Sequence, residues 1–151
     1  MEKNPILILD FPSFAYKLQK SAEKLLIFDE VSKKNRVLTP EEWVRQHCLN
    51  YLIHHLNYPS NLIQLEAPIF ANQLKRRSDI CIYDRNGKLF LLIECKAPQV
   101  NLDASVLQQV SQYQSVLKSP FWAITNGLEH KIFTLNQENQ VTILDFFPKF
   151  Q

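Results

Sequence analysis

Residues 79–96 read DICIYDRNGKLFLLIECK, and this stretch decides the fold. Asn86-Gly87 is the dipeptide most typical of a tight β-hairpin turn, and apolar runs flank it on both sides. Residues 89–93 are apolar on both faces, which is typical of a fully buried central strand. We therefore expect an antiparallel hairpin at the centre of the molecule, with strands over 79–83 and 88–96.

The same hairpin brings charged side chains together. Pairing across Asn86-Gly87 joins residues whose numbers add to about 173, so Asp79, which begins its strand, lies opposite Glu94. Because alternate side chains of a strand share a face, Glu94 and Lys96 project together and Cys95 projects to the other side. The sequence therefore predicts two carboxylates and one ammonium group at one end of the sheet.

Two carboxylates that lie directly opposite each other on neighbouring strands repel each other unless a cation lies between them or one is protonated. Oxygen ligands without His or Cys side chains favour Mg²⁺ or Mn²⁺. Such an ion stabilises the charge that develops during phosphodiester cleavage, and a neighbouring lysine orients the attacking water. In the structural alternative, Asp79 and Lys96 cap strand ends and Glu94 pairs with Lys96. The position of Glu94 after an apolar run, facing Asp79, favours the metal site.

A long helix is expected on each side of the hairpin. Thr39 can cap the first, Pro40 suits its first turn and Glu42 completes a capping box, so it should run to about Leu56. The second, over 101–118, has an apolar stripe at Val106, Val110, Tyr113 and Leu117. Further strands are expected at 25–28, 36–38, 61–69, 121–125, 131–135 and 141–144.

This order of elements predicts an α/β or α+β fold around a mixed central sheet. The 151 residues fit a single domain, with a strand and hairpin extension over 1–38 and a core over 39–136. The net charge of +2 does not by itself indicate a nucleic-acid-binding protein. Three cysteines without a CxxC pair indicate neither a disulfide framework nor a zinc ribbon. With no candidate signal peptide or membrane span, we expect a cytoplasmic protein without a membrane partner.

The segments RRSDI (76–80) and IECKAP (93–98) resemble the PD-(D/E)xK nuclease superfamily, and within it the N-terminal nuclease domain of type I restriction enzyme R subunits. The resemblance covers about 25–133 and includes residues 39–46, the pair Gln109 and Tyr113, and Thr125-Asn126-Gly127. It implies a restriction-endonuclease-like αβββαβ core whose mixed sheet is flanked by helices. Ser78 stands where the family has proline. A chain of 151 residues lacks room for the helicase motor, so a complete R subunit is not expected.

The resemblance also implies roles for the charged residues. Asp79 and Glu94 would bind Mg²⁺ or Mn²⁺, the main-chain carbonyl of Cys95 would add a ligand, and Lys96 would serve the nucleophilic water. The expected activity is metal-dependent hydrolysis of DNA phosphodiester bonds. The alternative is a catalytically silent module that keeps the fold and binds nucleic acid or a partner protein. The choice between DNA and RNA stays open, as does a homodimer that would cut both strands.

The first predicted helix offers one more carboxylate. Glu41 and Arg45 lie one turn apart on its apolar side, whereas Glu42 projects about 100° away. Glu41 either reaches the metal, as the first-helix glutamate of related nucleases does, or pairs with Arg45. We expect Glu42 to serve only as a capping residue.

Four other residues are candidates for contact with nucleic acid or the carboxylates. Gln109 lies at the edge of the second helix's apolar stripe, either near the active-site carboxylates or as a satisfied polar residue at the rim of the core. Tyr113 lies one turn later and is a candidate nucleic-acid contact. Arg76 and Arg77 either contact phosphates or belong to a solvated, exposed turn.

Overall fold

The computed structural model describes residues 7–71, 74–108, 112 and 118–151, with the backbone alone at 67–71 and 74–78. In chain order the elements are β1 (Leu18–Ser21), β2 (Lys24–Asp29), β3 (Lys34–Val37), α1 (Pro40–Asn50), a π-helical turn (Tyr51–His55), a 3-10 turn (Ser60–Leu62), β4 (Ile63–Ala71), β5 (Leu74–Tyr83), β6 (Leu89–Cys95), β7 (Phe121–Thr125), β8 (His130–Leu135) and β9 (Val141–Leu144). A helix also covers 104–108.

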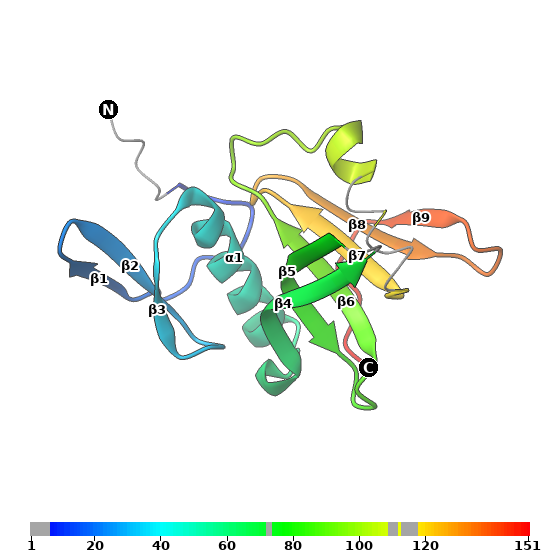
Figure 1. Cartoon of the computed structure of the whole chain (residues 1–151), viewed down its shortest axis with the longest axis horizontal. Coiled ribbons are helices and arrows are strands. Elements are labelled where there is room, and N and C mark those ends of the chain that lie inside the picture. Colours follow the sequence, from blue (N-terminus) through cyan, green and yellow to red (C-terminus); the bar gives the residue numbers. More distant parts are fainter. Residues whose placement is uncertain (1–6, 72–73, 109–111, 113–117) are drawn as a thin grey trace.

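The strands form two sheets, and α1 lies between them (Figure 1). β1–β3 make a small antiparallel sheet, and β4–β9 make a six-stranded sheet in sequence order. The larger sheet is mixed, because β6 and β7 pair in parallel while its other neighbours pair antiparallel. The predicted α+β fold with a mixed sheet and an N-terminal extension is confirmed. The extension has one strand more than predicted, because the fully exposed β1 carries no apolar pattern.

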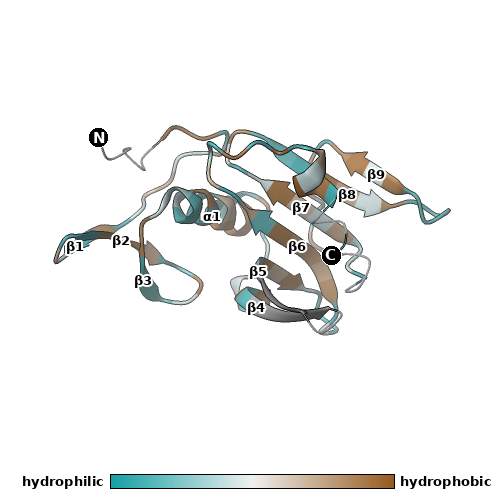
Figure 2. Cartoon of the chain, turned by 45° about the horizontal axis from the view of Figure 1, so that its top comes forward, coloured by the Kyte–Doolittle hydropathy of each residue, from teal (hydrophilic) through white to brown (hydrophobic). Residues whose placement is uncertain are grey.

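The central strands of the six-stranded sheet carry buried apolar residues on both faces, and most of β6 and β7 is brown in Figure 2. One face packs on α1 and the π-helical turn after it, where Val44 and Cys48 of α1 and Leu52 of the turn belong to the same buried cluster as Ile80 and Ile93. The opposite face carries a second cluster of Cys81, Leu92, Trp122, Ile124 and Phe133, against which Val106 and Leu107 pack. β6 therefore supplies buried residues to both sides, as the apolar run at 89–93 predicted.

α1 begins as predicted, with Thr39 Oγ1 accepting a hydrogen bond from the Glu42 amide at 3.0 Å. It does not continue regularly to residue 56, because α-helical geometry ends at Asn50 and a π-helical turn follows. All eight residues from Glu42 to Leu49 are buried, since sheets lie on two sides of the helix. In the described part of the chain, no helix combines the length and the apolar character that a membrane crossing requires.

The central hairpin has the predicted register. Ile80 pairs with Ile93, Cys81 with Leu92 and Ile82 with Leu91, and a bulge follows at Tyr83. Asp84 Oδ1 accepts hydrogen bonds from the Asn86 and Lys88 amides, which closes the turn. The expectation that Asp79 begins its strand is wrong. β5 begins at Leu74, because residues 74–78 pair with β4, so Arg76 and Arg77 lie in a strand and not in a turn.

The second predicted helix starts at 104 in place of 101, because Asp103 caps it by accepting a hydrogen bond from the Val106 amide at 3.1 Å.

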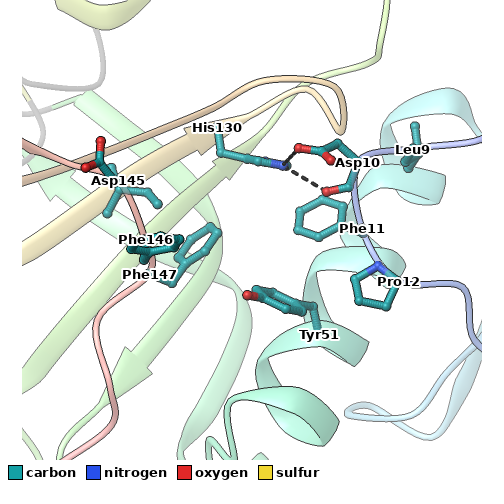
Figure 3. Close-up of a pocket in the computed structure, with 10 residues that line it drawn as sticks. Leu9, Asp10, Phe11, Pro12, Tyr51, His130, Asp145, Phe146 and Phe147 are labelled. Atoms are coloured by element: carbon teal, nitrogen blue, oxygen red, sulfur yellow. Dashed lines mark hydrogen bonds and ion pairs between the residues drawn. The ribbon is translucent and has the colours of Figure 1, made fainter.

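The segment before β1 docks on the turn that follows β7. The Asp10 amide donates to the Gly127 carbonyl at 2.7 Å, and His130 Nε2 lies 3.1 Å from the Asp10 carbonyl (Figure 3). His130 Nδ1 in turn lies 2.7 Å from Thr125 Oγ1. Gly127 has a φ of +85°, and a methyl group at its Cβ position would lie 2.9 Å from Leu9 Cδ2. The Thr125-Asn126-Gly127 motif therefore forms the surface on which the N-terminal segment packs.

Gly127→Ala should destabilise the protein by about 2–4 kcal/mol, because it combines left-handed backbone strain with overpacking against Leu9. Gly87→Ala is the matched control. Gly87 also has a positive φ, of +78°, but no atom lies within 4 Å of its Cβ position. Gly87→Ala should therefore destabilise the protein only through left-handed backbone strain, by about 1–2 kcal/mol. Chemical denaturation measures both, and equal losses would contradict the close packing at Gly127.

Candidate active site

Asp79 and Glu94 are the acidic pair at the end of the β5–β6 ladder. The backbone pairing reaches Ile80 and Ile93, and one further step in the same register sets Asp79 opposite Glu94. Beyond the paired residues, the Cys95 amide donates to Asp79 Oδ2 at 2.7 Å. A side-chain oxygen thus satisfies a backbone donor of β6, which fixes the Asp79 carboxyl next to the strand that carries Glu94.

The acidic pair has an altered proton affinity. Burial raises the pKa of Asp79 to about 6; the Cys95 amide opposes this change, and the negative charge of Glu41 adds to it. Burial and then the charge of Asp79 raise the pKa of Glu94 to about 7, although Lys96 acts in the opposite direction. The two carboxyls therefore hold protons more tightly than isolated carboxyls do, and a cation between them would relieve the repulsion.

Lys96 lies on the same side as the acidic pair. Its Nζ is 3.4 Å from Glu94 Oε1, and its backbone amide donates to the Thr125 carbonyl at 2.8 Å. Cys95, which lies between Glu94 and Lys96 in the sequence, is buried on the α1 side of the sheet. A hydrogen bond with Cys48 and burial both raise the pKa of the Cys95 thiol, so the side chain remains a neutral thiol. Any contribution of Cys95 to a metal would come from its main chain.

The two glutamates of α1 have different surroundings, and only that of Glu42 departs from the prediction. Glu41 is exposed and lines a cavity of about 280 Å³ together with Asp79, and its charge raises the pKa of both members of the acidic pair. Glu42 is only 6% exposed, and it accepts hydrogen bonds from Arg45 at 2.5 and 2.6 Å. The alternative in which Glu41 pairs with Arg45 is therefore wrong, because Arg45 pairs with Glu42. The expectation that Glu42 serves only as a capping residue is wrong, because its buried carboxylate pairs with Arg45.

Glu42 belongs to a network of five charged residues, of which Arg36, Glu42, Arg45 and Glu66 line the same cavity. Arg45 also contacts Glu66 at 3.1 Å, and Arg36 of β3 contacts Asp29 at 2.6 Å, Glu66 at 3.5 Å and Glu42 at 3.7 Å. Hydrogen bonds and charge attraction, first from Glu42 and then from Glu66, raise the pKa of Arg45 despite its burial. This ion network joins the small sheet, α1 and β4 beside Asp79.

The sequence predicted no role in the site for Arg36, Asp29 or Glu66. One signal for Asp29 was present: it alternates with Leu25 and Ile27 in β2, which places a carboxylate on the buried face of that strand. A buried carboxylate needs a cationic partner, and Arg36 is the nearest arginine in the sequence. Glu66 carries no comparable pattern.

Gln109 and Tyr113 lie outside the described residues, as do the side chains of Arg76 and Arg77. Over the described residues, no three His, Cys, Asp or Glu side chains are arranged as a ready-made metal centre.

Glu42→Gln should destabilise the protein by about 3 kcal/mol, because it leaves the buried guanidinium of Arg45 without its main counter-charge. Glu41→Gln, the neighbouring change at an exposed position, should alter stability by less than about 0.5 kcal/mol. Urea denaturation of both variants provides the comparison. A similar loss for each would show that the buried pair does not hold α1 in place.

Asp79→Asn should raise the melting temperature of the metal-free protein at about pH 8 and leave it nearly unchanged at about pH 4. The pKa of Asp79 is raised to about 6 from 3.8, so the folded state binds the proton more tightly than the unfolded state. Stability from this group is therefore full below about pH 4 and falls as the pH rises through about 6. A thermal scan across this range tests the sign, and a melting temperature at pH 8 that is equal in both proteins would contradict it.

Comparison with known proteins adds family evidence to this geometry. A family model described as "Type I restriction enzyme R protein N terminus (HSDR_N)" matches residues 40–148. No curated protein matches the chain. Among solved structures, a fragment described as belonging to an HsdR subunit of a type I restriction enzyme from Vibrio vulnificus YJ016 is 17% identical, with a TM-score of 0.48. The match covers 67% of this chain and 22% of that one, so this chain spans about a fifth of its length.

The family match contains the acidic pair, Lys96, the α1 glutamates and the Thr125-Asn126-Gly127 turn. It begins at the first residue of α1, so β1–β3 precede it. The chain belongs to the family of type I restriction enzyme R protein N-terminal domains.

Proposed function

We propose that this domain is a metal-dependent nuclease that hydrolyses DNA phosphodiester bonds. The observation that carries the proposal is the acidic pair beside Lys96: one strand register sets two carboxyls opposite each other, and their pKa values are raised to about 6 and about 7. Strongly perturbed carboxyls next to a specific cation are typical of functional sites. Membership of a restriction enzyme family supports a role on DNA.

The residues present fit Mg²⁺ or Mn²⁺. The available donors are carboxylate oxygens and main-chain carbonyls, which these ions prefer. Asp79 and Glu94 would hold the ion, the Cys95 carbonyl would complete the set, and Glu41 is the third carboxylate close enough to influence both. When bound, the ion would supply charge stabilisation to the phosphate and lower the pKa of an attacking water.

The other charged and polar side chains in and near the site have different roles. Lys96, held at 3.4 Å from Glu94, would orient the water and offset negative charge as the phosphodiester reacts. Arg45 does not contact substrate in this scheme, because Glu42 and Glu66 occupy its guanidinium. Gln109, Tyr113, Arg76 and Arg77 remain candidates for contact with the substrate.

A second candidate function is a catalytically silent DNA-binding or partner-docking domain. Its support is the lack of a preassembled three-ligand metal centre among the described residues. The two candidates differ in one observable: only the nuclease cuts DNA when Mg²⁺ or Mn²⁺ is added.

The test incubates the protein with supercoiled plasmid and with single-stranded DNA, with and without Mg²⁺ or Mn²⁺. Metal-dependent cleavage is expected, and Lys96→Ala should reduce its rate by at least about a hundredfold. Lys88→Ala, a change at an exposed lysine of the hairpin turn, is the matched control and should cut normally.

Calorimetric titration with Mn²⁺ separates binding from catalysis. Mn²⁺ should bind wild type and Lys96→Ala, and binding should be lost in Glu94→Gln. Cleavage that needs no metal, or that persists in Lys96→Ala, would refute the nuclease. Mn²⁺ binding without any cleavage would select the silent domain.

A further inference from the structure

A second groove runs between the small sheet and α1, beyond the ion network. Its volume is about 420 Å³, and its walls include aromatic, cationic and amide side chains: Phe14, Tyr16, Lys17, Phe28, Lys33 and Gln46. None of the residues of the acidic pair or the ion network lines it. Most of its wall precedes residue 40, outside the family match. The proposed nuclease chemistry leaves this groove without a role.

Gln46 lies at the floor of the groove with an unused donor. The residue is 3% exposed, and its Nε2 has no hydrogen-bond partner among the described residues. A buried donor without an acceptor costs about 1–3 kcal/mol, so folded proteins seldom keep one without reason. An acceptor on a molecule bound in the groove would satisfy it.

Tyr16 forms an aromatic wall above this floor. Its ring packs edge-on against Trp43, with centroids 4.9 Å apart, and against Phe14 at 5.7 Å. Trp43 is buried and its Nε1 donates to the Leu7 carbonyl at 2.8 Å, so the support behind Tyr16 is fixed. Tyr16 itself stays 40% exposed. A supported yet accessible aromatic ring is suited to stacking with a planar group.

The rim of the groove is positively charged. Lys17 and Lys33 are exposed, and Lys17 Nζ lies 5.7 Å above the Phe28 ring. The carboxylate of Glu30, the one acidic group among the groove residues, lies 2.8 Å from His54 Nε2, so two lysines face one carboxylate. Residues 17–38 contain six Lys or Arg and three Asp or Glu, whereas the whole chain has 17 and 15, so the excess positive charge comes from this segment.

We propose that the groove binds an unpaired nucleotide of a single-stranded nucleic acid. The base stacks on Tyr16, a base carbonyl accepts a hydrogen bond from Gln46 Nε2, and Lys17 and Lys33 contact the adjoining phosphates. Aromatic rings interleaved with cations are the usual surface for single strands, because every base has a stacking face and every linkage a negative charge. A basic peptide would be repelled by the lysines, and a duplex presents no free base face.

This inference rests on the proposed nuclease function, because the bound single strand would be the substrate of the acidic pair. Glu42, which lines the cavity beside Asp79, and Gln46, which lines the groove, lie one turn apart on the same face of α1, about 6 Å along its axis at about 1.5 Å per residue. The groove and the cavity that holds Asp79 are therefore neighbours along α1. A strand held in the groove would pass close to the acidic pair.

The test measures fluorescence anisotropy of a labelled oligothymidylate with wild type in EDTA, where no cleavage takes place. Tyr16→Ala should weaken binding at least about fivefold, the lower limit for one stacked base. Gln46→Met, which keeps side-chain length and removes the donor, should weaken binding by about fivefold while the melting temperature stays equal or rises. A purely structural Gln46 would give no loss of affinity.

The contribution of Lys17 and Lys33 to binding is measured separately, from the dependence of affinity on salt concentration. Lys17→Ala with Lys33→Ala should reduce the slope of log affinity against log salt by about 1.4, at about 0.7 per phosphate contact with a single strand. Lys88→Ala with Lys149→Ala removes the same charge at other exposed positions and should leave the slope unchanged.

The inference is overturned if wild type does not bind the oligonucleotide, if a duplex or thymidine monophosphate binds as tightly, or if the groove variants bind like wild type. Failure of the nuclease has a different signature. Loss of DNA cleavage with groove-dependent binding intact would refute the catalytic proposal alone, and cleavage that is unaffected by Tyr16→Ala and Gln46→Met would refute only the groove.

Discussion

The register between β5 and β6 is the constraint on which the rest of the structure depends. Side chains alternate along both strands, so a shift by one residue would move Asp79 and Glu94 from their shared face into the core against α1. The Asp84 turn and the bulge at Tyr83 set this register at one end of the hairpin. At the other end, the bond from the Cys95 amide to Asp79 takes over where backbone pairing stops. The acidic pair and the α1 cluster are thus two results of one alignment.

A second constraint arises because α1 is enclosed by two sheets. Enclosure removes water from charged positions on the helix, so Glu42 and Arg45 must satisfy each other, and Arg36 and Glu66 complete the set. Ion pairs of this kind are not strong sources of stability, but breaking one leaves a buried charge uncompensated. Their effect is to hold β3 and the start of α1 in one arrangement next to Asp79. Glu41, one residue earlier, is left unburied and near the acidic pair.

Sequence patterns predicted the parts whose causes are local. The Asn86-Gly87 turn, the apolar run of β6 and the Thr39 cap led to the fold class, to the alignment of Asp79 with Glu94, and to the start of α1. The failures have tertiary causes. β1 is exposed and carries no apolar pattern, and the charged residues 75–77 are strand because β4 lies alongside. The apolar stripe of α1 located one sheet and could not reveal the other, so the burial of Glu42 and its pairing with Arg45 were not predicted. The unpaired amide of Gln46 has no sequence signature.

The docking of the N-terminal segment has a consequence for where this domain begins. The family match starts at residue 40, yet Leu9, Ile27 and Leu38 belong to the same buried cluster as Val44 and Leu49 of α1. Asp29 and Arg36, which close the ion network, also precede that boundary. A chain shortened to the matched residues would lack the segment that covers one side of α1, so buried residues of that helix would be exposed to water. The unit recognised by comparison is therefore smaller than the unit that folds.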